Sequence, residues 1–193
     1  MHNKNTTKTL IGILPKYTLS KYIEAELKEK KSRFIAQLTP VKTEKSALEF
    51  ISDMKKKHST AKHNVYAYIL RDGTARYSDD GEPHHTAGLP ILELLKHENM
   101  QNIACVVTRY FGGILLGTGG LVRAYTGSVK SALDKAIEQE LIIPDIELEQ
   151  HVVMCSYSEL DSVKNKLIGE GALNLEFDFG GQVKITFDMP KST

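Results

Sequence analysis

The chain has 193 residues, of which 41% are hydrophobic and 25% are charged, a balance typical of soluble globular domains. This length suffices for one domain or two small ones. Every apolar run falls well short of the roughly 20 residues that cross a bilayer, so we expect no membrane span. The two cysteines, Cys105 and Cys155, each lie inside a strand-like apolar run. That placement predicts buried, reduced thiols in a cytoplasmic protein rather than a disulfide.

The net charge of +1 conceals a gradient along the chain. Residues 1–62 hold 14 Lys and Arg against 6 Asp and Glu, residues 63–140 hold 7 against 9, and residues 141–193 hold 4 against 9. A basic surface of this kind attracts nucleic acid or an acidic partner. Part of it, Lys55–Lys57, also fits the end of a helix, where the helix dipole favours cations. Both interpretations stay open.

Hydrophobic periodicity predicts most of the secondary structure, because a period of two marks a strand and a period of 3.6 marks a helix. Residues 1–16 show little pattern and are expected to form a flexible leader. In the first half we expect strands at 22–31, 33–41, 65–70 and 75–78 and an amphipathic helix at 43–58. In the second half we expect a helix at 88–96, a buried strand at 103–109 and a helix at 121–140.

Pro144 and Asp145 interrupt the pattern of regular secondary structure and suggest a domain boundary. After them the pattern predicts a βαββ unit of about 50 residues, which is marginal for an independent domain. Its elements are expected at 146–157, 159–169, 173–179 and 183–187.

The most informative segment is Thr108–Tyr125, in which five glycines fall within nine residues: Gly112, Gly113, Gly117, Gly119 and Gly120. Glycine is costly to order, so such a cluster indicates positive φ angles or a close approach to the backbone. Arg109 and Arg123 bracket the cluster, and a helix begins at its end. Guanidinium groups beside a helix start suit an anionic oxygen. The segment matches neither a Walker loop nor a dinucleotide fingerprint.

A second segment is dense in ionisable groups, because Asp79, Asp80, Glu82, His84 and His85 fall within seven residues. Carboxylates and imidazoles in such proximity could bind a metal or act as general acid and base. A turn held by its own side chains explains the composition equally well. The spacing matches no metal motif, so we expect neither a metal nor a cofactor.

Aromatic and histidine side chains flank both segments. Tyr110, Phe111 and Tyr125 could stack on bases, as in single-strand binders, or pack the glycine-rich segment onto the core. His58 or His63 could join Arg109 at a site, or simply hold a capped loop.

The motifs resemble the YigZ/IMPACT family. The resemblance rests on Thr108–Tyr125, with supporting matches at Lys31–Ala36, His63–Ala67, Ser78–Pro83 and Thr86–Ile91. It implies an α+β fold in which residues 17–140 form an Impact-type domain, with a four-stranded sheet and two helices similar to domain IV of elongation factor G. Residues 145–193 then resemble the ferredoxin-like second domain of bacterial members, truncated from βαββαβ to βαββ.

The same resemblance implies a regulator of translation that binds RNA or the ribosome. The residues expected to contact nucleic acid are Arg33, Arg109, Tyr110, Gly112, Gly113, Gly117, Gly119, Gly120 and Arg123. One alternative is a hydrolase-type enzyme acting on a small phosphorylated or peptide substrate, with Asp80, Glu82, His84 and His85 as acid and base groups. Another is a protein–protein interaction module. The oligomeric state stays open.

Overall fold

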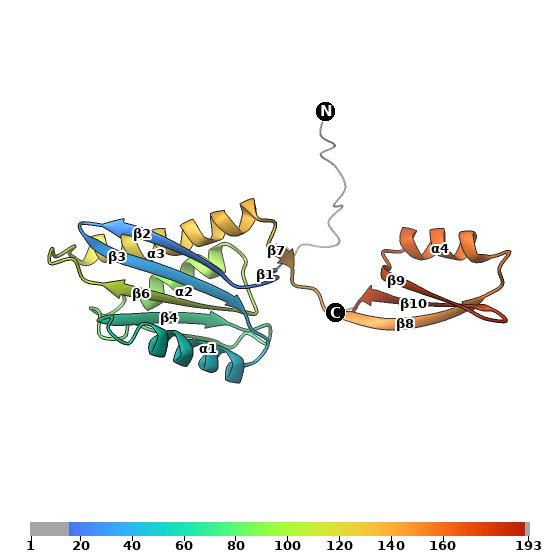
Figure 1. Cartoon of the computed structure of the whole chain (residues 1–193), viewed down its shortest axis with the longest axis horizontal. Helices are drawn as coiled ribbons and strands as arrows, with labels where there is room; N and C mark the ends of the chain where they lie inside the picture. The colour runs from blue at the N-terminus through green and yellow to red at the C-terminus, as the bar shows by residue number, and fades with distance from the viewer. Residues whose placement is uncertain (1–15, 192–193) are drawn as a thin grey trace, which may run out of the picture. The chain divides into compact units, whose positions relative to one another are not determined.

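The computed structural model describes residues 16–191, which form two compact units divided between Asp145 and Ile146 (Figure 1). The flexible leader expected at the N-terminus lies outside the described residues, apart from Lys16. The family resemblance ended the first domain at residue 140, whereas the sequence pattern suggested a boundary at Pro144 and Asp145. The structure adds strand β7 (Ile142–Pro144), which pairs antiparallel with β1 (Tyr17–Leu19).

The first unit is built on a five-stranded sheet in the order β2–β3–β6–β4–β5, and every neighbouring pair is antiparallel. The strands are β2 (Ile23–Glu29), β3 (Ser32–Pro40), β4 (His63–Ile69), β5 (Ala75–Ser78) and β6 (Ile103–Tyr110). The central strand β6 is buried on both faces along nearly its whole length. This is why its sequence is a continuous apolar run instead of an alternation.

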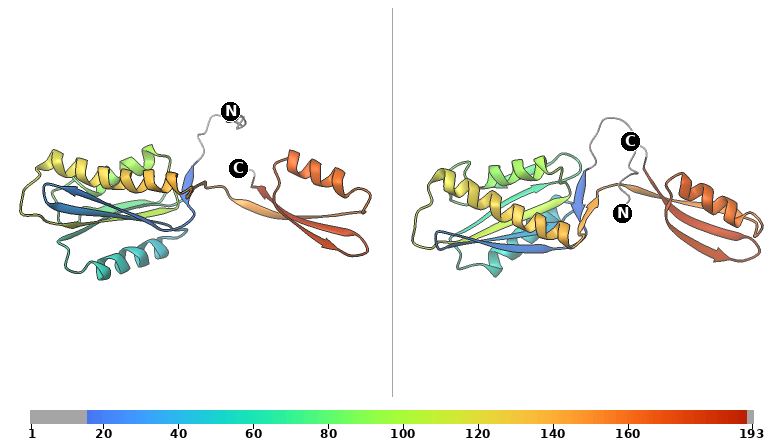
Figure 2. Two further views of the ribbon diagram at one scale, coloured as in Figure 1. Left: turned by 45° about the horizontal axis from the view of Figure 1, so that its top comes forward. Right: turned by 90° about the horizontal axis from the view of Figure 1, so that it is seen from above.

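Helices cover both faces of this sheet (Figure 2). Helix α1 (Glu44–Lys57) packs on one face, and α2 (Gly88–His97) and α3 (Thr118–Glu138) pack on the other. The expected α+β class is confirmed. The resemblance implied a four-stranded sheet and two helices, whereas in the described part of this unit the main sheet has a fifth strand, β5, and α2 is a third helix. The periodicity at 75–78 and 88–96 had already predicted both.

The second unit is a βαββ arrangement with strand order β8–β10–β9. It comprises β8 (Leu148–Cys155), α4 (Leu160–Gly169), β9 (Leu173–Phe179) and β10 (Val183–Pro190). Its small core includes Val183 and Ile185 from the central strand together with Leu167 from the helix. Within the described residues the unit matches the first four elements of a ferredoxin-like βαββαβ fold.

Both cysteines are buried and free, as predicted. Burial raises the pKa of the Cys105 thiol well above its ordinary value, so this thiol stays protonated and unreactive. None of the helices within residues 16–191 is long and apolar enough to cross a membrane.

Candidate functional site

A buried ionic cluster lies beneath the glycine-rich segment. Arg109, near the end of β6, donates from Nη1 to Oε1 of Glu82 at 2.6 Å, and the Tyr125 hydroxyl donates to the same oxygen at 2.7 Å. Register between β4 and β6 sets His63 opposite Arg109, with its Nε2 atom 3.9 Å from that oxygen. The side chains of Arg109 and Glu82 are only 7% and 3% exposed.

The Arg109 guanidinium is also enclosed by aromatic rings. Its Cζ atom lies 5.4 Å from the ring centres of both Phe34 and Phe111. Its buried Nε atom has no hydrogen-bond partner among the described residues. The sequence suggested that Arg109 contacts a phosphate directly, but this degree of burial does not fit such a contact. Arg109 instead holds the glycine-rich segment against the Glu82 loop.

The three aromatic side chains occupy different environments. Tyr125 is fully buried and packs edge-on against Phe34, with ring centres 5.0 Å apart. Burial and the adjacent Glu82 carboxylate raise the pKa of its phenol. The Tyr110 hydroxyl shares a hydrogen bond of 2.9 Å with Nδ1 of His58. Phe111, by contrast, leaves 45% of its surface exposed. Of the three, only Phe111 presents much surface on which a base could stack.

Gly112 is explained by a close approach between two parts of the chain. A Cβ atom at this position would lie 2.0 Å from the carbonyl carbon of Lys31, a distance that no real contact reaches. The Gly112 N–H donates to Oγ of Ser32 at 3.1 Å. The glycine-rich segment is therefore locked onto the turn between β2 and β3. Gly117, with φ at +73°, turns the chain into α3.

The β2–β3 turn brings two lysines to this end of the sheet. Lys30 and Lys31 have φ angles of 44° and 66°, in the left-handed region that few residues other than glycine adopt, and both are exposed. Lys62 lies with Nζ 5.9 Å from the ring centre of Phe111. The exposed Arg123 has no carboxylate partner among residues 16–191. These four cations come from three separate segments.

Arg33, also expected at the site, is engaged on the surface. Its Nε and Nη2 atoms donate to the two carboxylate oxygens of Glu26 at 3.1 and 2.8 Å, and its guanidinium lies 5.5 Å from the Tyr110 ring centre. A phosphate would compete with Glu26 for this group. Arg33 thus lies at the same end of the sheet but is less available to a phosphate than Lys30, Lys31 or Arg123.

The acidic loop is a folded turn. Asp79 accepts from the N–H groups of Ala87 and Gly88 at 3.2 and 2.8 Å, which caps α2. Asp80 accepts from the Asn64 N–H at 2.7 Å and from Lys55 at 2.9 Å. The carboxylates of Asp79, Asp80 and Glu82 are thus all bonded to other groups of the protein.

The two histidines of this loop, His84 and His85, lie on the surface. Among the described residues no three potential ligands are grouped as a metal site would require. Of the four residues considered for acid–base chemistry, Asp80 and Glu82 therefore serve the fold, and the two histidines are exposed.

Sequence reasoning counted Lys30, Lys31 and Lys62 in the basic first third of the chain but did not place them beside the glycine-rich segment. Their clustering depends on a contact between residues 80 positions apart in the chain. The one available signal was the Lys-Lys pair at the tip of a predicted hairpin.

Comparison with known proteins agrees with the fold. Residues 30–133 match the Impact N-terminal domain. The chain is 46% identical over 130 residues to IMPACT family member YvyE of Bacillus subtilis, a match covering 65% of this chain and 60% of that protein. It is 38% identical over 145 residues to IMPACT family member YigZ of Escherichia coli, covering 73% and 69%.

A solved structure described as a hypothetical protein superposes with a TM-score of 0.64 at 30% identity, covering 92% of this chain and 87% of that one. The match with YvyE spans less than two thirds of that protein's length. The domain match covers more than half of the sequence and includes the whole glycine-rich segment, and on that basis the chain belongs to the IMPACT family.

Proposed function

We propose that this chain binds RNA, free or within the ribosome, through its basic end, and that it regulates translation by doing so. The basic end is defined as Lys30, Lys31, Lys62, Arg123 and the segment Phe111–Gly120. The observation that carries the proposal is the contact between Gly112 and Lys31, which fixes a basic turn against a glycine-rich loop. A translational role accords with the family resemblance to elongation factor G.

Electrostatics and backbone geometry favour phosphate at this end. Four exposed cations with no carboxylate partner recorded among residues 16–191 would each displace counterions from a nucleic acid. Helix α3 begins here with Gly117 as N-cap and without a side-chain cap, so the N–H groups of its first turn lack a capping side chain. Arg123 lies above that first turn. Phosphate would complement both features.

Apolar groups at the loop tip suit unpaired bases. Leu115 is 82% exposed, and Phe111 and Ile114 are each more than two fifths exposed. Exposed rings between cations are how single-stranded nucleic acids are held without strong sequence preference, because every base has a stacking face. We therefore expect single-stranded regions to bind more tightly than duplex.

The test is binding to a single-stranded RNA oligonucleotide and to purified ribosomes across a salt series. The logarithm of the binding constant falls linearly with the logarithm of the salt concentration, and we call the steepness of this line the salt slope. Neutralising the turn with the double substitution Lys30→Gln and Lys31→Gln should lower the salt slope by roughly 1.4, about 0.7 for each lost contact with a single strand. Arg123→Gln should lower it by about half as much. The matched control is Lys45→Gln, an exposed lysine on α1, which should leave the slope unchanged.

Absence of binding at low salt, or equal losses in the control, would contradict the proposal.

The exposed tip at Ile114 and Leu115 also favours a second candidate, docking to a protein partner. Binding of that kind would be largely insensitive to salt, would survive Arg123→Gln and would be lost in Leu115→Ser. The hydrolase alternative is not proposed, because the carboxylates that it requires are engaged internally.

A further inference from the structure

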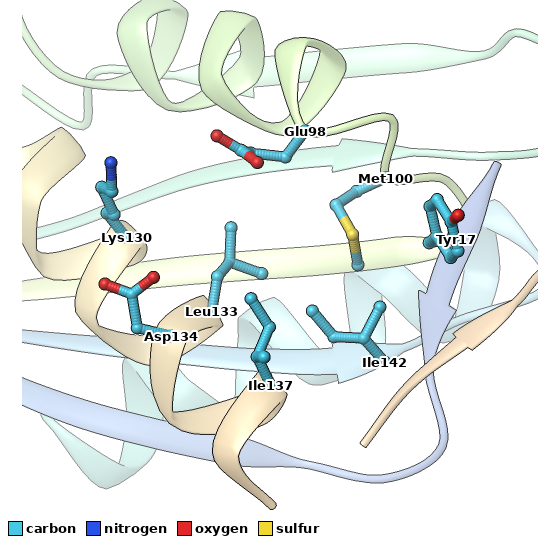
Figure 3. A pocket seen from close by; sticks show the side chains of 8 residues that line it. All are labelled: Tyr17, Glu98, Met100, Lys130, Leu133, Asp134, Ile137 and Ile142. Carbon is cyan, nitrogen blue, oxygen red and sulfur yellow. The ribbon is translucent and has the colours of Figure 1, made fainter. Parts of the chain in front are cut away.

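A second concave site lies on the first unit, at the far end of α3 from the glycine-rich segment. The cavity has a volume of about 320 Å³, at the lower end of the range for small-molecule sites (Figure 3). Lys130 lies 12 positions beyond Thr118, about 18 Å along the helix, so the cavity is separate from the basic end. It is lined by Tyr17, Glu98, Met100, Lys130, Leu133, Asp134, Ile137 and Ile142.

The floor of this cavity is apolar and continuous with the main core. Met100 and Leu133 are 2% and 4% exposed and belong to the main core, and Ile142 packs against that core from β7. Ile137, one turn beyond Leu133 on α3, is 62% exposed and forms an open wall. An apolar group of a ligand would gain by removing this surface from water.

The rim carries both signs of charge. Lys130 and Asp134 are one helical turn apart on α3, and Glu98 faces them from the end of α2 (Figure 3). Glu98 lies 3.4 Å from the exposed His97, whereas Lys130 and Asp134 have no ion-pair partner among residues 16–191. Two carboxylates and one ammonium around an apolar floor complement a ligand with an ammonium group, a carboxylate and an apolar body.

We propose that this cavity binds a free apolar α-amino acid. The ammonium group of the ligand would lie between Glu98 and Asp134, and its carboxylate would pair with Lys130. Its side chain would cover Met100 and Leu133. This site shares no residue with the basic end, so the proposal stands independently of RNA binding.

The test is a titration of the full chain with free amino acids, in which NMR monitors the methyl groups of Met, Leu and Ile. L-leucine and L-methionine should shift the Met100 and Ile142 methyl resonances. N-acetyl-L-leucine lacks the ammonium and L-leucinamide lacks the carboxylate. Each should bind more weakly, by up to about fivefold, because each loses an ion pair with an exposed side chain. Asp134→Asn should weaken the binding of L-leucine to a similar extent for the same reason.

The matched control is Glu138→Gln, which changes an exposed carboxylate one turn further along the same helix face and should leave binding unchanged. The proposal is overturned if neither amino acid shifts these methyl groups at about 10 mM, a concentration that would detect even millimolar affinity. Equal binding of the acetylated analogue would also overturn it. The methyl resonances of the cavity should also be recorded without ligand. If they shift with protein concentration, or when residues 1–14 are removed, the cavity has another occupant and the proposal is overturned.

Discussion

Removing the Glu82 carboxylate should destabilise the first unit strongly. Glu82→Gln keeps the shape of the side chain but leaves the Arg109 guanidinium buried without its counter-charge. Breaking a buried pair by removing one partner costs about 3–5 kcal/mol, because the remaining charge is left in a poorly solvated site. For a unit of this size, each kcal/mol lowers Tm by about 2–4 °C, so we expect a fall of roughly 6–20 °C.

The assay is urea and thermal unfolding followed by circular dichroism. The matched control is Glu26→Gln, the same change in the ion pair with Arg33, whose side chains are 33% and 48% exposed. An exposed pair contributes less than about 1 kcal/mol, so the control should unfold almost like the wild type. A Glu82→Gln loss below about 1 kcal/mol, or equal to the control, would refute the role assigned to the buried pair.

Three further predictions concern Gly112, Tyr125 and His58. Gly112→Ala should cost about 1–3 kcal/mol by overpacking against Lys31, whereas Gly119→Ala, whose Cβ atom would meet Nη1 of Arg123 at an ordinary contact distance of 3.6 Å, should be neutral or stabilising, as measured by urea unfolding. Tyr125→Phe should cost about 1.5–3 kcal/mol by removing a hydrogen bond to a carboxylate; an unchanged midpoint would contradict this. Burial lowers the pKa of His58, so the folded state binds fewer protons than the unfolded chain, and stability should fall as pH drops through about 6.5. Thermal scans should show a smaller fall in His58→Gln.

The sequence pattern predicted most of the fold, because each element carries its own local signal. The continuous apolar run at 103–107 predicted a buried strand, and apolar residues three and four positions apart predicted α1 and α3. Strand β7 was missed, since three residues that pair with β1 across more than 120 positions leave no local pattern. Its place in the first unit depends only on tertiary pairing.

The candidate site was harder to predict for the same reason. Arg109 beside a glycine cluster suggested a phosphate contact, but its partner Glu82 lies 27 positions earlier, in a loop whose composition suggested catalysis. Only the three-dimensional structure shows that the two groups neutralise each other. It also brings Lys31 against Gly112, which moves the available positive charge to the β2–β3 turn.

The central claim, that the basic end binds RNA, is tested most directly by mapping backbone amide shifts of the full chain during titration with a single-stranded RNA oligonucleotide. We predict that the largest shifts fall at 30–31 and 111–123 and disappear when the salt concentration is raised. The account would be contradicted if no amide shifted at low salt, or if the shifts gathered elsewhere and left these residues unchanged.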